Sequence, residues 1–148
     1  TGSRALALAV MQRLIAFAVF ICLACGIVAA QETSSSVKAD VRGVGVDDTV
    51  ALVQDTHKFS VTVHLAGKHS KVQVLTFGLG QSQDALCDPP VVLTVIPLSC
   101  SFQAATSVLP GCVESKGAQG LVLTGSGECD PINLYWDHRT NRLAWWRN

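Results

Sequence analysis

The clearest pattern in the chain is an alternation of apolar and polar residues over Lys58–Leu65, repeated over Lys71–Phe77. In the first run every second residue is Phe, Val or Leu, and the residues between them are Ser, Thr or His. A period of two places one set of side chains on each face of a β-strand. The segment between the runs, Ala66–His69, has the composition of a turn, so the two runs predict an antiparallel hairpin.

Shorter runs of the same kind occupy most of the chain after residue 48. Val91–Ile96 is a largely β-branched run that follows Pro89-Pro90 and stops at Pro97, which predicts a buried strand. The last two runs flank the polar segment Asp137–Asn141 and predict a hairpin with a five-residue loop. The other strands are expected at Thr49–Gln54, Ser99–Gln103, Leu121–Thr124, Ile132–Trp136 and Arg142–Trp146.

Sustained helical periodicity is absent from the sequence after Gln31. We therefore predict an all-β fold, a small disulfide-stabilised β-sandwich or barrel of about 7–9 short antiparallel strands. The Cys…Trp…Cys spacing of antibody domains is missing, so the pattern does not indicate an immunoglobulin domain.

Residues 1–30 have the layout of an upstream extension followed by a secretory signal peptide. Met11 is the only methionine and the expected start; Arg13 is positive, and Leu14–Val28 is an apolar run. Small residues end the segment, which predicts a cut after Ala30, before Gln31. An uncleaved membrane anchor is the alternative, although Arg13 interrupts the longer apolar stretch that it would need. A lipoprotein would use Cys25, but the preceding Cys22-Leu23-Ala24 lacks the usual leucine at its first position.

Three intervals follow from these patterns: the leader at 1–30, a flexible N-terminal arm at 31–48 and a single β domain at 49–148. The arm is polar, and we expect one edge strand in it near Val41–Val46. Asp47-Asp48, at its end, is interpreted as a turn.

Four cysteines remain after the leader: Cys87, Cys100, Cys112 and Cys129. An even number on a secretory route predicts two disulfides. Three pairings are open, and we favour pairing of nearest neighbours, 87 with 100 and 112 with 129. A zinc site is the rival use, but it would require a closely spaced Cys pair that is absent here.

The charge balance limits the partners. The chain has 11 Lys+Arg and 11 Asp+Glu, a formal net charge of +0, and no basic stripe. We therefore expect no nucleic acid as a partner, and no membrane once the signal is removed.

The C-terminal hairpin carries the candidate ligand-binding residues. It holds the only tyrosine and all three tryptophans, beside an acid, a histidine and an arginine. Aromatic rings beside polar groups could stack on the apolar face of a sugar or bind a protein partner. The alternative is that the rings only close the core. The candidates are Tyr135, Trp136, Asp137, His138, Arg139, Trp145 and Trp146.

Catalytic signals are weak throughout the sequence. There is no G-x-S-x-G, and Gly125-Ser126-Gly127 has the composition of a turn. No H-x-H or H-E-x-x-H pattern occurs among the histidines, and the acidic residues are interpreted as turn formers. We expect no catalytic residues, no metal and no cofactor.

These observations together predict a small secreted, non-catalytic recognition protein. It would bind an extracellular glycan, a cell surface or a protein through the aromatic hairpin. Two alternatives stay open. The first is a structural component of a cell wall or matrix. The second is a secreted enzyme inhibitor that uses the proline-stiffened loop after Cys87.

Overall fold

The computed structural model describes residues 33–67, 71–80, 82, 85–102 and 107–147. The predicted leader, with Met11, Cys22, Cys25 and the cut after Ala30, lies outside these residues. Residues 31–148 form one compact unit. The described part contains strands and turns and no helix.

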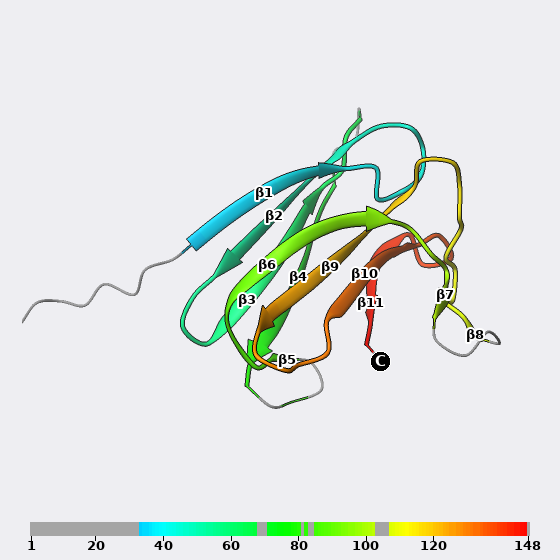
Figure 1. Ribbon diagram of the computed structural model, residues 1–148. Helices are drawn as coiled ribbons and strands as arrows, with labels where there is room; N and C mark the ends of the chain where they lie inside the picture. Colours follow the sequence, from blue (N-terminus) through cyan, green and yellow to red (C-terminus); the bar gives the residue numbers. More distant parts are fainter. Residues whose placement is uncertain (1–32, 68–70, 81, 83–84, 103–106, 148) are drawn as a thin grey trace, which may run out of the picture. The chain divides into compact units, whose positions relative to one another are not determined.

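The first sheet has five strands in the order β1-β2-β3-β4-β5 (Figure 1). Every neighbouring pair is antiparallel except β4 and β5, which are parallel. The predicted hairpin forms from β3 and β4. The strands are β1 (Thr33–Ala39), β2 (Asp48–Gln54), β3 (Lys58–His64), β4 (Val72–Leu79) and β5 (Ala85–Leu86).

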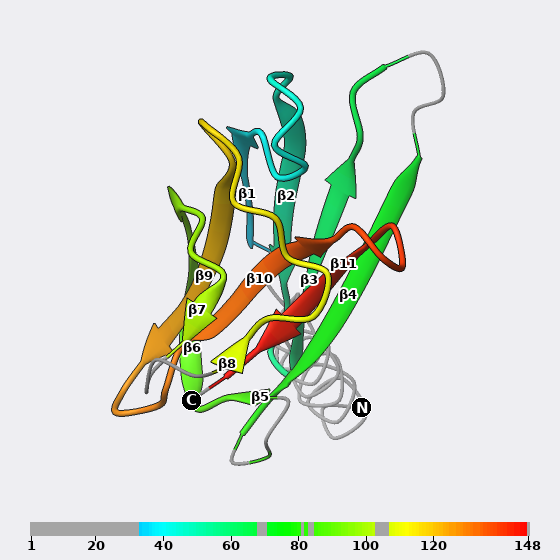
Figure 2. The same cartoon turned by 90° about the vertical axis from the view of Figure 1, so that its right-hand side faces the viewer.

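The second sheet has four strands in the order β11-β10-β9-β6, and a two-stranded piece pairs β7 with β8. The two main sheets pack as a sandwich and do not close into a barrel (Figure 2). The predicted all-β class is thus confirmed. The strands are β6 (Asp88–Pro97), β7 (Ser101–Phe102), β8 (Ser107–Val108), β9 (Gln119–Ser126), β10 (Ile132–Asp137) and β11 (Arg142–Trp146).

The core lies between the two main sheets and uses the faces that the alternation predicts. Phe59, Val61 and Val63 of β3 are fully buried, while Ser60 and Thr62 between them are partly exposed. The inward side chains of the second sheet complete one shared cluster. Apolar burial of this kind is the main favourable contribution to folding.

The strand expected to be buried at Val91–Ile96 is instead an edge. It lies within β6, which pairs with β9 on one side, and burial alternates along it. Val91 is buried, whereas Val92 is 52% exposed. The run of β-branched residues correctly predicted a strand, but composition does not distinguish a central strand from an edge.

The interval predicted to be an arm, 31–48, belongs to the compact unit. The expected edge strand exists, but it is β1 and not Val41–Val46, which lies in the loop between β1 and β2. Asp48 is not a turn residue: it is fully buried at the start of β2. Its carboxylate accepts hydrogen bonds from the Arg42 guanidinium at 2.7 and 3.0 Å and from the Ala66 N–H at 2.7 Å. A buried charge needs such partners, which the sequence pattern did not reveal.

Two disulfides form, but not in the pairing that we favoured. Cys87 pairs with Cys129 and Cys100 pairs with Cys112. Cys87 precedes β6 and Cys129 follows β9, and these strands are antiparallel neighbours whose ends lie together. The pairing of strands that are distant in sequence therefore decided the pairing of the cysteines.

Three glutamines join the two sheets, each at the end of a strand. Gln54 and Gln73 of the first sheet accept hydrogen bonds from backbone N–H groups of the second, at 2.7 and 2.8 Å. Gln119 of the second sheet accepts one from Asp40, just after β1, at 2.8 Å. Each glutamine side-chain oxygen thus accepts a hydrogen bond from a backbone N–H, as the carbonyl of a neighbouring strand would in a sheet.

Candidate functional site

The C-terminal hairpin, β10 with β11, forms as the sequence predicts, with Asp137 opposite Arg142 at its closing pair. Residues opposite each other in an antiparallel pair point to the same face. The core face therefore carries Leu134 with Trp145 and Trp136 with Leu143, and the outer face carries Tyr135 with Ala144.

Tyr135 and Trp136 have no ring face open to a ligand. Trp136 is 2% exposed within the core, and Tyr135 is 5% exposed on the outer face. The Tyr135 hydroxyl donates a hydrogen bond to the Pro110 carbonyl at 3.2 Å, so the 109–112 turn covers this face. Burial raises the pKa of the Tyr135 hydroxyl, and the nearby Asp137 carboxylate raises it further. A stacking platform that includes Tyr135 is therefore wrong for this structure.

Asp137 holds the turn of the hairpin. Its carboxylate accepts hydrogen bonds from the Arg139 and Thr140 N–H groups and from the Thr140 hydroxyl, at 2.9, 3.3 and 2.9 Å. Burial alone would raise the pKa of Asp137, but these hydrogen bonds outweigh it and hold the pKa below its ordinary value. Gly111, with φ +69°, lies so close that a Cβ there would collide with the carboxylate.

The other candidates lie at the surface. His138 and Arg139 are exposed on the turn, where Arg139 Nη2 lies 3.8 Å from the Asp137 carboxylate. Trp145 is 40% exposed, with its ring edge-to-face on Phe77 at a centroid distance of 5.7 Å. Trp146 is half-buried on the outer face, opposite Asn133. The structure thus divides the seven candidates between the core, the turn and the strand end.

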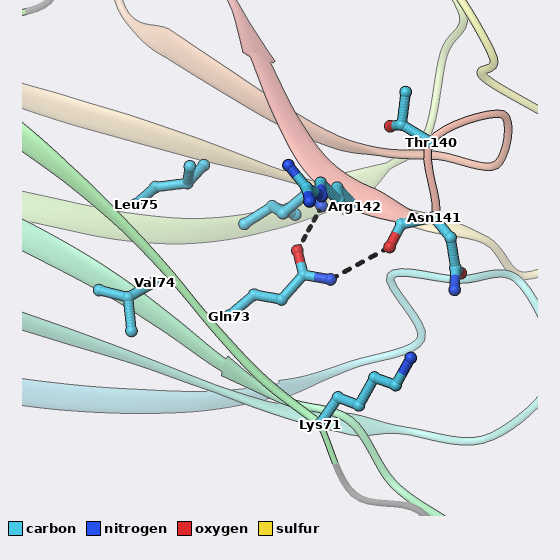
Figure 3. Close-up of a pocket in the computed structure, with 8 residues that line it drawn as sticks. Lys71, Gln73, Val74, Leu75, Thr140, Asn141 and Arg142 are labelled. Atoms are coloured by element: carbon cyan, nitrogen blue, oxygen red, sulfur yellow. Dashed lines mark hydrogen bonds between the residues drawn. The ribbon is translucent and has the colours of Figure 1, made fainter.

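A groove of about 530 Å³ lies between the hairpin and β4 (Figure 3). We call it the β4–β11 groove. Residues that are 70 positions apart in the sequence form its two sides, because the edge strand β11 lies beside β4. The lining residues are Lys71, Gln73, Val74, Leu75, Thr140, Asn141, Arg142 and Leu143.

Gln73 spans the β4–β11 groove. Its side chain accepts a hydrogen bond from the Leu143 N–H at 2.8 Å and donates one to the Asn141 carbonyl at 3.2 Å, both drawn in Figure 3. Beyond the groove, Phe77 and Trp145 close the space between the two strands. The lining itself combines apolar side chains, such as Leu75 and Leu143, with polar and charged ones, such as Lys71.

The charges on the lining are of one sign. Lys71 and Arg142 are the charged members, and no lining residue is acidic. Sequence reasoning missed Lys71, Gln73 and Arg142. The available signal was Gln73, a single amide on the strand face that otherwise carries Leu75 and Phe77. A polar residue on an apolar face indicates a partner or an opening to water.

Metal ligands do not gather anywhere in the described ranges: they contain no cluster of three or more His, Cys, Asp or Glu side chains. In the same part of the chain, no helix is long and apolar enough to cross a bilayer.

Comparison with known proteins gives no match to a protein-family model, a curated protein or a solved structure.

Proposed function

We propose that residues 31–148 form a secreted, non-catalytic recognition domain that binds its ligand in the β4–β11 groove. The observation that carries this proposal is the groove itself, an open depression of about 530 Å³ built on the hairpin that the sequence singled out. Ligand sites are concave, with a few polar groups among apolar ones, and the lining has this character.

Extracellular location is supported by the two disulfides, because such bonds persist in oxidising compartments. The signal-like layout of residues 1–30 supports the same location.

A role in recognition is supported by the chemistry of the lining. Lys71, Arg142, Gln73, Asn141 and Thr140 supply hydrogen-bond donors and positive charge. None of the lining side chains is a carboxylate or an imidazole, the usual groups for proton transfer near neutral pH.

The ligand classes differ in which residue they need. A glycan would require Trp145 or the half-buried Trp146, since the rings of Tyr135 and Trp136 are buried. A protein or peptide would use the amides and cations of the groove. The inhibitor alternative is less favoured. It would use Asp88-Pro89-Pro90 as a protruding loop, but these residues begin β6.

The test is a binding screen of oxidised 31–148 protein against polysaccharides, a glycan array and an array of extracellular protein domains. Lys71→Ala should weaken a groove ligand at least tenfold without lowering the melting temperature. The matched control is Lys116→Ala, at an exposed lysine outside the groove, and it should not weaken binding. A ligand that binds wild type and Lys71→Ala equally, and is equally insensitive to Arg142→Ala and Trp145→Ala, would contradict the proposal.

A further inference from the structure

One edge of β4 is open. β3 pairs with β4 along its full length, but β5 pairs only with Gly78 and Leu79. Among the described residues, no strand pairs with the other edge over Val72–Thr76. The Leu65 N–H donates to the Lys71 carbonyl, and the Leu79 N–H donates to the His57 carbonyl, so the odd-numbered residues of β4 face β3. Val72, Val74 and Thr76 therefore direct their N–H and C=O groups away from β3.

This edge lacks the features that usually protect an exposed strand. Proteins block edges with proline, charge, bulges or very short strands. β6, an edge of the second sheet, has Pro89, Pro90 and an irregular register before Val92. Between Val72 and Leu79, β4 has no proline, no charge and a continuous register. An unblocked edge is a template for an added strand.

The side chains around the edge determine which kind of strand can be added, through their exposed apolar surface and their charge. Val72 and Val74 are 53% and 57% exposed on the outer face of the sheet. On the other face the edge borders the β4–β11 groove, whose charged lining residues, Lys71 and Arg142, are both cations. A second copy of this chain would bring the same cations, so like charges disfavour self-pairing.

We propose that the ligand of the β4–β11 groove is an extended acidic peptide that adds to the Val72–Thr76 edge as a further strand. The inference rests on the proposed function. Successive side chains of a strand point to opposite faces. One set of peptide side chains lies beside Val72 and Val74 and is apolar. The other set lies over the groove and carries carboxylates toward Lys71 and Arg142.

The test uses fluorescein-labelled hexapeptides and fluorescence anisotropy with the oxidised 31–148 protein. The probe alternates valine and glutamate; one control replaces glutamate with lysine, and a second separates the residues into a block of three valines and a block of three glutamates. We expect the alternating acidic peptide to bind at least tenfold more tightly than either control. High salt should weaken its binding because the attraction involves charges near the surface.

Val74→Pro tests the backbone contacts. Proline removes an N–H that points away from β3, so the ladder within the sheet keeps its bonds. We expect at least a tenfold loss of peptide binding for Val74→Pro, and little loss for Val74→Thr, which keeps the N–H. If Val74→Pro unfolds the protein, hydrogen exchange of wild type decides: the peptide should protect the Val72, Val74 and Thr76 amides.

Any one of these outcomes would overturn the inference: equal binding of the acidic and lysine peptides, peptide binding that Val74→Pro does not change, or no protection of the edge amides. A concentration-dependent dimer that Val74→Pro abolishes would also overturn it, in favour of self-pairing. A glycan or folded protein domain that binds in a Lys71-dependent way without these peptide effects would leave the proposed function standing and remove only the peptide. If no ligand binds in the groove, both the proposed function and the peptide inference fail.

Discussion

The two sheets of the sandwich meet on two sides. On each side a glutamine side chain joins them, but the contacts around the two glutamines differ. On one side β1 lies beside β6, and on the other β11 lies beside β4. A glutamine joins the sheets on each side, Gln54 on the first and Gln73 on the second. The core is shared, so the difference between the two sides lies in what surrounds each glutamine.

On the β1–β6 side, the further bonds near Gln54 lie within each sheet and not between the sheets. Gln54 also donates to the Thr33 hydroxyl at 2.7 Å, and Ser126 donates to the Pro89 carbonyl at 2.6 Å. The Cys87–Cys129 disulfide joins the start of β6 to the segment that follows β9.

On the β4–β11 side, three side-chain contacts run between the sheets: the Gln73 bridge, the Phe77–Trp145 contact and a hydrogen bond from Arg147 to the Ala85 carbonyl at 2.7 Å. Both sides carry a groove, of about 340 Å³ beside Gln54 and about 530 Å³ beside Gln73. The comparison therefore turns on the edge strands: β6 has two prolines near its start, whereas β4 has none and leaves the Val72–Thr76 edge open among the described residues. Binding surfaces are commonly drawn from such less constrained parts of a structure.

The largest effect is expected from removing the disulfide that links the start of β6 to the segment after β9. Cys87→Ser with Cys129→Ser opens a link between residues 42 positions apart, and the chain-entropy model gives a loss of about 4 kcal/mol in the free energy of unfolding. Cys100→Ser with Cys112→Ser, 12 positions apart, should lose about 3 kcal/mol. Urea denaturation without reductant measures both. A larger loss in the second double variant would contradict the order.

An intermediate effect is expected from the two glutamines. Gln54→Ala leaves the Val91 N–H without its partner, and we expect a loss of about 1–3 kcal/mol in the free energy of unfolding. Gln73→Ala should cost a similar amount, because each glutamine accepts a hydrogen bond from one backbone N–H and lines a groove that water can enter. Urea denaturation of both variants gives the comparison. Clearly unequal losses would contradict this expectation and show that water reaches one of the two N–H groups more easily than the other.

The smallest effect is expected on the stability of the protein at low pH, to which one aspartate near each side contributes. Backbone N–H groups of His57 and Lys58 lower the pKa of Asp55 in the β2–β3 turn, and the hydrogen bonds at the hairpin turn lower that of Asp137 despite its burial. A pKa lowered by folding stabilises the protein above the ordinary value of 3.8, and this contribution is lost as the pH falls through the lower folded value.

The measurement is an NMR titration of the side-chain carboxyl carbons, in which both groups should titrate below 3.8. Asp55→Asn and Asp137→Asn should each reduce the loss of melting temperature between pH 5 and roughly pH 2, the range over which such carboxylates become protonated. An unchanged acid dependence in both variants would show that these turns do not contribute to it.

Much of the fold could be predicted because its signal is local. The alternation in Lys58–Leu65 and Lys71–Phe77 correctly predicted β3 and β4, and the polar segment at 137–141 correctly predicted the hairpin. The candidate site was predicted less well. The sequence located the hairpin, but the side chains that line the groove are not the aromatic ones.

The all-β class, the hairpins and the two faces of Lys58–Leu65 could be inferred from the residues alone, because the period of two of a strand shows in neighbouring positions. The packing of the whole chain was needed to show which cysteines pair, that Pro110 covers Tyr135, that Arg42 neutralises Asp48, and that Gln73 spans a groove. Each of these contacts joins residues whose proximity depends on the order of the strands or the packing of loops and sheets, and that arrangement follows from burying the whole core at once.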